Sequence, residues 1–336
     1  MSGLLDTVPD EQRGLLRPAP PGAELAARPM LATLSDRREF GEGWIFERKL
    51  DGVRLLAVRE GGRVRLLSRT GQRLDASYPE VAEALAAQER DDFTIDGEVV
   101  AFSGGRTDFS RLQRRLGLTR RRDIEATGVA VTYYVFDLLR LDGADTRSLP
   151  LRTRKSLLRR ALGYRAPLRL TPHRNAGGAE LLADACGRGW EGLIAKRADG
   201  PYRPRRSADW LKLKCEQGQE FVVGGFTEPA GSRVGLGALL LGYYEDRALR
   251  YAGKVGTGFD RRTLLALRGR LDGLHRDTSP FTGAVREARA RWVAPELVAQ
   301  IAFTEWTRDG MLRHPRFLGL REDKRPEAVV RERAAL

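Results

Sequence analysis

The sequence predicts an α+β protein with two domains, a larger body of mixed sheets and helices followed by a smaller β-barrel. The chain has 336 residues, and domains of roughly 150 residues each would account for that length. Strand-like runs alternate with amphipathic helical stretches as far as Cys215. Beyond it, short strands alternate with glycine-rich turns around a single helical stretch, which is typical of a small barrel.

The larger domain is expected to contain strands rich in leucine, β-branched and aromatic residues, each bounded by turn signals. These runs are Trp44–Leu50, Val53–Val58, Arg63–Arg69, Phe93–Phe102, Val129–Leu139, Gly192–Arg197 and Trp210–Cys215. Apolar residues at helical spacing predict helices over Pro79–Gln88, Arg152–Leu162 and Gly178–Arg188. Together they favour mixed antiparallel sheets accompanied by helices.

The smaller domain is expected to be a barrel of the oligonucleotide-binding (OB) type. A helix is predicted over Arg261–Leu274 and a later strand near Val298–Trp306, and several short strands with one intervening helix suit that architecture. The predicted boundaries are a proline-rich N-terminal arm at 1–24, the larger domain at 25–217, the barrel at 218–327 and a C-terminal tail at 328–336.

Charge and apolar content narrow the class of protein. Lys and Arg number 59 against 45 Asp and Glu, which gives a formal charge of +14. A surplus of cations favours a polyanionic partner, because cations that displace condensed counterions gain affinity for nucleic acid. No apolar run approaches the ~20 residues that cross a bilayer, and the N-terminus lacks a signal-peptide pattern. We therefore expect a cytoplasmic protein with no membrane partner.

Cysteine and histidine are scarce. The two cysteines, Cys186 and Cys215, have no metal-ligand spacing, and the three histidines are isolated from one another. These counts exclude a disulfide-rich scaffold and a zinc domain.

The candidate nucleophile is Lys49. It lies at the end of a strand-like run, two positions before the turn pair Asp51-Gly52, so we expect its amine at a strand edge that faces a cleft. A lysine attacks only as the neutral amine, and neighbouring cations lower its pKa by destabilising the ammonium form. The strand period of two predicts that three runs present a polar face to this cleft. The paired positions are Glu47 with Lys49, Asp96 with Glu98, and Lys212 with Lys214.

The order of the motifs is more specific than any one of them. In sequence they are Glu47–Arg54, Ser68–Gly71, Asp96–Glu98, Tyr134–Asp137, Glu191–Lys196, Trp210–Lys214 and Arg313–Lys324. This series resembles the covalent nucleotidyltransferase superfamily, within it the ATP-dependent DNA ligases, and in particular the ligase domain of bacterial non-homologous end-joining ligases. The resemblance covers essentially residues 28–326. It implies a nucleotidyltransferase (adenylation) domain followed by an OB-fold domain.

The resemblance implies a role for each motif residue. Lys49 would attack the α-phosphate of ATP, expel pyrophosphate and hold AMP as a phosphoramidate. Glu47 would contact the adenine and Phe136 would stack on it. Arg54 and Arg69 would reach the ribose and phosphate region.

Further positions match acids and cations of the family. Glu98 and Glu191 would hold a divalent metal, in keeping with the preference of Mg²⁺ for one or two carboxylates plus substrate oxygens. Lys196, Lys212 and Lys214 would surround the phosphates and stabilise the transition state. We expect these lysines also to lower the pKa of Lys49.

The last signature lies on the barrel. Arg321, Asp323 and Lys324 follow an Arg-His-Pro-x-Phe-x-Gly-Leu run. By the resemblance, they swing over the nucleotide to orient pyrophosphate in the first step, and the barrel then turns to clamp DNA.

The resemblance implies an ATP-dependent DNA ligase that seals a 3′-hydroxyl to a 5′-phosphate in nicked or broken duplex DNA, with ATP and Mg²⁺ or Mn²⁺, in DNA repair and end joining. A Ku-like end-binding protein is a candidate partner, and a monomer is expected. Only 48 residues precede Lys49, so we expect a minimal ligase. The initial Met favours a standalone enzyme over a piece of a longer chain, and that alternative stays open.

Two alternatives remain open. An RNA ligase or an mRNA-capping-type guanylyltransferase would share the lysine chemistry. Glu47 disfavours capping, because its carboxylate accepts a hydrogen bond from the adenine amino group where guanine presents a carbonyl. A non-catalytic nucleic-acid-binding module is the other alternative, and the complete set of lysines and acids argues against it.

Overall fold

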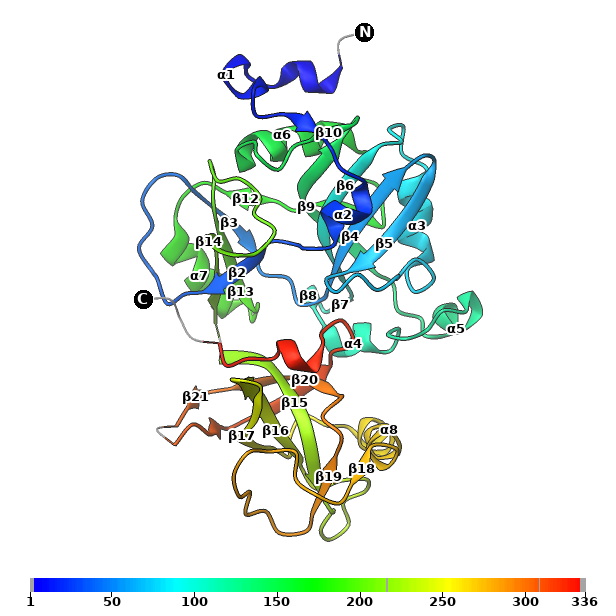
Figure 1. Cartoon of the computed structure of the whole chain (residues 1–336), viewed down its shortest axis with the longest axis vertical. Coiled ribbons are helices and arrows are strands. Elements are labelled where there is room, and N and C mark those ends of the chain that lie inside the picture. The colour runs from blue at the N-terminus through cyan, green and yellow to red at the C-terminus, as the bar shows by residue number, and fades with distance from the viewer. Residues whose placement is uncertain (1–2, 216, 308, 333–336) are drawn as a thin grey trace. The chain divides into compact units, whose positions relative to one another are not determined.

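A computed structural model describes residues 3–215, 217–307 and 309–332. The described residues form two compact units, unit 1 at 3–215 and unit 2 at 217–332, each with its own apolar core (Figure 1). Unit 1 combines two mixed sheets with helices, and unit 2 consists mainly of strands with one long helix. The predicted α+β class is therefore confirmed.

Sheet A is the larger sheet of unit 1. Its path runs β1 (Arg17–Pro18), β10 (Ala144–Asp145), β9 (Thr132–Leu141), β6 (Phe93–Val100), β4 (Val53–Glu60) and β5 (Arg63–Ser68), with β11 (Leu168–Leu170) added in parallel to β9. The other pairings are antiparallel. A short hairpin of β7 (Phe102–Ser103) and β8 (Arg106–Thr107) follows β6.

Two bulges interrupt the pairing of β9 with β6. Asp137 lies opposite Asp96 and Val135 opposite Gly97, so Phe136 is an extra residue on its strand. Leu139 is extra in the same way between Leu138 and Arg140. A bulge re-aims the side chain that it adds, and both residues join one buried cluster with Trp210 rather than the main core of sheet A.

Sheet B carries the other candidate residues. Its order is β12 (His173–Arg174), β3 (Trp44–Arg48), β13 (Gly192–Arg197), β14 (Arg206–Lys214) and β2 (Leu31–Leu34). Gly192 has φ of 141°, and a Cβ there would overlap the carbonyl oxygen of Leu213. Only glycine therefore lets the chain enter β13 this close to β14.

Unit 1 has seven α-helices among its described residues. They are α1 (Asp10–Arg13), α2 (Gly22–Ala26), α3 (Pro79–Ala86), α4 (Phe109–Gln113), α5 (Arg121–Ala126), α6 (Leu151–Ala161) and α7 (Gly178–Gly187). Of these, α2, α3, α6 and α7 pack against the sheets. In Figure 1, α7 lies beside β13 and α3 beside β5, and the contacts agree. The three predicted helices and seven predicted strand runs of this unit are confirmed, with ends shifted by a few residues.

The N-terminal segment is not the extended arm that its prolines predict. A 3₁₀ turn, η1 (Leu4–Thr7), precedes α1, and β1 pairs with β10. Leu4 and Val8 are buried in the main core of unit 1 with side chains of α6. Burial of these two apolar residues, four positions apart, holds the segment against the body.

Unit 2 is built around a long strand. β15 (Gln217–Thr227) pairs with β16 (Leu239–Glu245), β19 (Ala290–Val293) and β20 (Val298–Phe303). The remaining elements are β17 (Ala248–Val255), α8 (Arg261–Asp272), β18 (His275–Arg276), β21 (Glu305–Trp306), β22 (Leu312–Arg313), β23 (Arg316–Leu320) and η2 (Pro326–Ala328). The helix and the later strand predicted for this region are confirmed.

The C-terminal tail predicted at 328–336 is partly folded. Val329 is fully buried in the core of unit 2, and Val330 forms a bridge with Tyr244. Residues 333–336 lie outside the described residues. No helix in the described part of the chain combines the length and the apolar character that a membrane crossing requires.

Candidate active site

Lys49 lies where the chain passes from sheet B to sheet A, directly after β3 and before β4. Its backbone N–H donates to the carbonyl of Gly192 at 2.9 Å, which fixes the loop against β13. Its Nζ lies 2.5 Å from Oε1 of Glu191, the residue just before β13. Because β3 and β13 are antiparallel, the residue after β3 and the residue before β13 lie at the same end of this strand pair. This arrangement brings the candidate nucleophile and a carboxylate together.

The expectation that lysines lower the pKa of Lys49 is wrong for this structure. Burial does lower it, but the carboxylate of Glu191 and, more weakly, those of Asp51 and Glu98 raise the pKa of Lys49 above its ordinary value. The charges that dominate at Nζ are acids, because Lys196 is engaged elsewhere in the site. The side chain of Lys49 is therefore a protonated ammonium group that forms an ion pair with Glu191.

Glu47 belongs to a buried cluster with two lysines. Its Oε1 accepts from Nζ of Lys155 at 2.5 Å, and its Oε2 lies 2.7 Å from Nζ of Lys196. Burial raises the pKa of Glu47, but the two ammonium groups outweigh it and hold the pKa below its usual range. Burial also lowers the pKa of Lys196 despite this carboxylate. The side chain assigned to the adenine thus carries a cation on each oxygen.

Lys155 was missed by the sequence analysis. It lies on α6, 108 residues from Glu47. It is buried on a helix otherwise rich in exposed basic residues. Local periodicity hints only that position 155 falls on the same face as buried Leu151 and Leu158.

Sheet A supplies the opposite wall. Nε and Nη2 of Arg54 donate to the two oxygens of Asp96 at 2.5 Å each, and the Tyr202 hydroxyl donates to Asp96 at 2.6 Å. Burial lowers the pKa of Arg54, but Asp96 outweighs it and raises it. Arg54 is positioned by this bidentate pair rather than directed freely into the cleft.

Phe136 is nearly buried, and cations approach its ring. Cζ of Arg54 lies 4.7 Å from its centroid and Nζ of Lys196 lies 4.3 Å from it. Lys196 also lies 4.0 Å from the ring centroid of Trp210, which meets Phe136 edge to face. A base that stacked on Phe136 would therefore exchange a cation contact for an aromatic one.

Three of the remaining candidates are half-buried, Lys212 and Lys214 on β14 of sheet B and Glu98 on β6 of sheet A. Lys212 lies across from Ile194, and Lys214 across from Gly192. Glu98 lies across from Arg54 and contributes to raising the pKa of both Arg54 and Lys49. Of the three, Glu98 is the one whose charge acts on Lys49.

Arg69 lies just outside this group. It follows β5 in a turn closed by a hydrogen bond from Gly71 N–H to the Ser68 carbonyl at 2.9 Å. Ser68 pairs with Leu55, the neighbour of Arg54. Arg69 thus follows β5, the strand next to the one that carries Arg54.

The signature residues of unit 2 interact within that unit. Arg321 forms a bidentate pair with Asp323 through hydrogen bonds of 2.8 Å, and Nζ of Lys324 donates to Glu220 at 2.7 Å. Asp323 is buried. These residues form an ordered charged cluster at the end of β23.

The described residues contain no group of three or more His, Cys, Asp or Glu side chains arranged to hold a metal by themselves. Glu98 and Glu191 are nevertheless close enough to Lys49 for both to act on its charge. Two carboxylates completed by substrate oxygens and water suit Mg²⁺ or Mn²⁺. The donor set fits a cation that arrives with a nucleotide.

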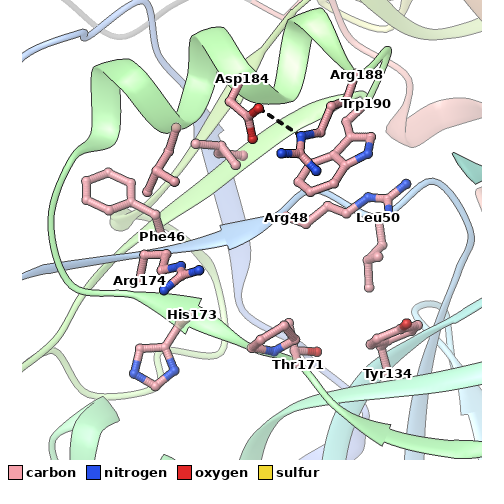
Figure 2. A pocket seen from close by; sticks show the side chains of 13 residues that line it. Phe46, Arg48, Leu50, Tyr134, Thr171, His173, Arg174, Asp184, Arg188 and Trp190 are labelled. Carbon is pink, nitrogen blue, oxygen red and sulfur yellow. Dashed lines mark hydrogen bonds and ion pairs between the residues drawn. The ribbon is translucent and has the colours of Figure 1, made fainter. Parts of the chain in front are cut away.

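Arg48 is the last residue of β3 and lies between Glu47 and Lys49 in the sequence. Successive side chains of a strand point to opposite faces. The guanidinium of Arg48 lies over the ring of Trp190, with Cζ 4.2 Å from the centroid, as Figure 2 shows. It lines a cavity of about 600 Å³ that also includes Phe46 and Tyr134. The sequence analysis assigned no role to Arg48 or Trp190.

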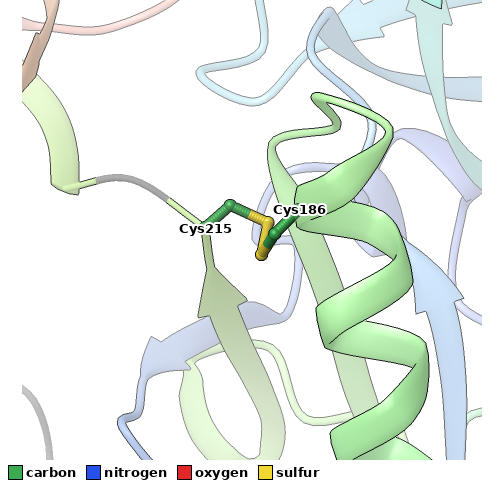
Figure 3. The surroundings of a disulfide bond; sticks show 2 residues. All are labelled: Cys186 and Cys215. Carbon is green, nitrogen blue, oxygen red and sulfur yellow. A yellow bond between two sulfur atoms is a disulfide. The ribbon is translucent and has the colours of Figure 1, made fainter.

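The two cysteines form one disulfide. Cys186, at the end of α7, is joined to Cys215, directly after β14 (Figure 3). The low cysteine count excluded a disulfide-rich scaffold, but it gave no sign that this pair, 29 residues apart, would meet. Pairing depends on the contact of α7 with sheet B, which is a tertiary feature.

Known protein families match both units. Residues 29–214 match the family described as ATP dependent DNA ligase domain, and residues 232–324 match ATP dependent DNA ligase C terminal region.

Curated relatives and a solved structure agree with these matches. The chain is 42% identical over 316 residues to the multifunctional non-homologous end joining protein LigD of Pseudomonas aeruginosa, covering 91% of this chain and 37% of that protein. It is 40% identical over 296 residues to the multifunctional non-homologous end joining DNA repair protein LigD of Mycobacterium tuberculosis, covering 86% and 37%. A mycobacterial DNA ligase D complexed with ATP and MES aligns with a TM-score of 0.64 and 37% identity, covering 92% of this chain and 99% of that one. The chain thus spans little more than a third of these two curated relatives.

Proposed function

Because this chain belongs to the family of ATP-dependent DNA ligases, we propose that it seals breaks between a 3′-hydroxyl and a 5′-phosphate in duplex DNA, with non-homologous end joining as its setting. The observation that carries the proposal is the pairing of Lys49 with Glu191 at 2.5 Å, at the junction of two sheets that also bring in Glu98, Arg54 and Phe136. The names of the curated relatives support the end-joining setting.

In the proposed first step, Lys49 becomes the nucleophile. Its Nζ releases a proton to solvent and attacks the α-phosphorus of ATP, so a P–N bond forms while the bond to pyrophosphate breaks. AMP then passes to the 5′-phosphate of DNA, and the 3′-hydroxyl displaces it. Splitting the synthesis in this way keeps the phosphoryl group activated throughout.

The other residues bind and orient the nucleotide in this proposal. Phe136 stacks on the adenine, Glu47 accepts from its amino group, and Arg54 and Arg69 hold the ribose and phosphate. Lys196, Lys212 and Lys214 stabilise charge that develops on the phosphates. Glu98 and Glu191 hold Mg²⁺ or Mn²⁺, which when bound supplies charge that neutralises the phosphates and lowers the pKa of Lys49.

Residues of unit 2 complete the proposal. Residues 25–217 serve as the adenylation domain and 218–327 as the OB domain. Arg321, Asp323 and Lys324 orient pyrophosphate in the first step. A Ku-like protein recruits the enzyme, which acts as a monomer. The match of residues 232–324 to the ligase C-terminal region supports this division of roles.

One labelling experiment tests the function. The protein is incubated with α-labelled ATP and Mg²⁺, and then mixed with nicked duplex DNA. Label on the protein, followed by its release as AMP with sealed DNA, is the expected result. Addition of EDTA should prevent labelling. The same experiment is run with α-labelled GTP and with nicked RNA. Labelling by GTP alone would favour capping chemistry, and sealing of nicked RNA alone would favour an RNA ligase.

Replacing Glu191 with glutamine is expected to shift the pH profile of self-adenylation to lower pH. The carboxylate raises the pKa of Lys49, so its removal lowers that pKa and increases the fraction of neutral amine at a given pH. The rate at the plateau should fall, because Glu191 also holds the metal in this proposal. The midpoint is measured by intact-mass analysis over a pH series.

Glu98→Gln is the matched control for that shift. Its carboxylate has a weaker effect on the pKa of Lys49 than that of Glu191, so the midpoint should move less. Equal midpoints in the wild type and Glu191→Gln would show that this ion pair does not set the ionisation of Lys49.

Lys155→Met is expected to raise the KM for ATP by about ten- to a hundredfold, on the basis that a hydrogen bond to a charged group contributes roughly 1.5–3 kcal/mol. The change removes the cation from Oε1 of Glu47, which Lys155 positions for the adenine. Sealing of DNA that is already adenylated should be less affected, because that substrate is also held through its DNA and does not depend on the affinity for free ATP. The measurement compares the two reactions at equal fractions of folded protein.

Two variants control for effects on folding. Lys155→Arg keeps the positive charge and should retain most of the ATP affinity. Lys254→Met breaks a surface ion pair of 2.7 Å with Glu287 and should change neither reaction. Equal losses of adenylation and of sealing in Lys155→Met would indicate a structural role alone.

A further inference from the structure

The cavity beside Arg48 has the size of a small-molecule site and lies apart from the proposed ATP contacts. Its volume is about 600 Å³, within the range of roughly 300–1,000 Å³ that ligand pockets occupy. Figure 2 shows α7 and Trp190 on one side and Tyr134 and Thr171 on the other. Side chains at positions 46, 48 and 50 line it, which alternate with Glu47 and Lys49.

Arg48 lacks an anion in this cavity. Its Nε and Nη2 are buried and make no hydrogen bond among the described residues. Burial lowers the pKa of Arg48, opposed by the nearby Tyr134 hydroxyl. A half-buried guanidinium with unmet donors costs free energy that an anionic ligand would recover.

The rest of the lining favours an anion with an apolar part. Arg174 and Arg188 also line the cavity, and the one carboxylate among its described lining residues, Asp184, already pairs with Arg188 at 2.8 Å. Phe46 and Leu193 supply apolar wall. Guanidinium groups favour phosphate because their donors match its oxygens, while an apolar wall suits a planar base.

We propose that this cavity binds a second nucleotide unit, with its phosphate on Arg48 and Arg174 and its base against the apolar wall. The choice of a nucleotide over other planar anions rests on the proposed function. The unit comes either from an unpaired strand at a DNA end or from a free nucleotide. Occupancy would be felt at the active site, because Arg48 precedes Lys49 and Trp190 precedes Glu191 along the chain.

The test uses full-length Lys49→Ala protein with excess ATP and Mg²⁺, so that the proposed ATP site is filled without covalent reaction. The probes are thymidine 5′-monophosphate and a 5′-phosphorylated hexathymidylate strand. Both are titrated while tryptophan fluorescence is followed, since Trp190 lines the cavity. We expect saturable quenching that Trp190→Phe removes, although anisotropy of a labelled strand should still report binding to that variant.

Arg174→Gln should weaken probe binding about tenfold and reduce its salt dependence by about one charge. Arg48→Met should weaken it at least as much. Arg122→Gln is the matched control, because its side chain is 79% exposed on α5 of the same unit. Arg174 is exposed, so its variant should fold normally.

The outcomes separate the sources. Binding of the strand but not of the monophosphate assigns the cavity to a DNA end, and equal binding of both assigns it to a free nucleotide. Equal affinities in Arg174→Gln, Arg48→Met and Arg122→Gln would overturn the proposal, as would the absence of saturable binding. Failure of the proposed function is read separately, as a lack of AMP on wild-type protein.

Discussion

Replacing Lys49 with alanine is expected to abolish formation of the covalent AMP adduct completely. The amine supplies the electron pair of the P–N bond, and alanine has no group that can replace it. Glu191, 2.5 Å away in the wild type, would remain but cannot form the same adduct. The measurement is intact-mass analysis after incubation with ATP and Mg²⁺, and sealing of nicked DNA should be lost with the adduct.

Lys254→Ala is the matched control, because Lys254 also pairs with a carboxylate, that of Glu287 at 2.7 Å, but lies on unit 2 and is half-exposed. It should adenylate as the wild type does. An undiminished adduct in Lys49→Ala would place the nucleophile elsewhere and remove the basis of the proposed function.

Asp137→Ala is expected to destabilise unit 1 by about 3–5 kcal/mol, the usual cost of leaving one partner of a buried ion pair without the other. Asp137 and Arg154 are both fully buried, and they share hydrogen bonds of 2.7 and 2.9 Å. The guanidinium would lose its only carboxylate among the described residues that pair with it. Denaturant unfolding, followed by a signal from unit 1, measures the loss.

The ion pair between Asp137 and Arg154 should also make the free energy of unfolding depend on pH. Burial raises the pKa of Asp137, but Arg154 outweighs it and holds the pKa below its usual value. A carboxyl with a depressed pKa stabilises the fold above its ordinary pKa, and this contribution is lost as the pH falls towards the depressed value. Asp137→Ala should lack this acid-side loss.

Glu83→Ala provides the comparison. Its partner Arg121 and Glu83 itself are both well exposed, so the ion pair is screened by solvent and its removal should leave the unfolding midpoint unchanged. A similarly small effect of Asp137→Ala would show that unit 1 rearranges to hydrate Arg154.

Local pattern was sufficient for the longer strands of unit 1, but not for short ones such as β2, β11 and β12. Period-two alternation placed Leu211 and Leu213 in a core and Lys212 and Lys214 outside it, as the burial confirms. Alternation does not extend to Phe136, because the inserted residue of a bulge leaves no trace in the pattern. Because of the bulge, Asp137 lies directly opposite Asp96 on the neighbouring strand.

Ion pairs between residues far apart in the sequence could not be predicted from local sequence patterns. The sequence indicated cations near Lys49, but only the packing shows that Lys196 turns to Glu47 and leaves acids at Lys49. Lys155 reaches Glu47 from a helix far along the chain. Such pairings follow from tertiary packing, which composition and spacing do not encode locally.

The Cys186–Cys215 bond turns part of the site into a covalent ring. The closed loop includes Glu191, Lys196, Trp210, Lys212 and Lys214. In the chain-entropy view, a loop of this length adds roughly 3–4 kcal/mol by restricting the unfolded chain. A protease that cut the backbone anywhere inside the ring would leave both fragments tethered, and they would part only after a thiol reagent opened the bridge.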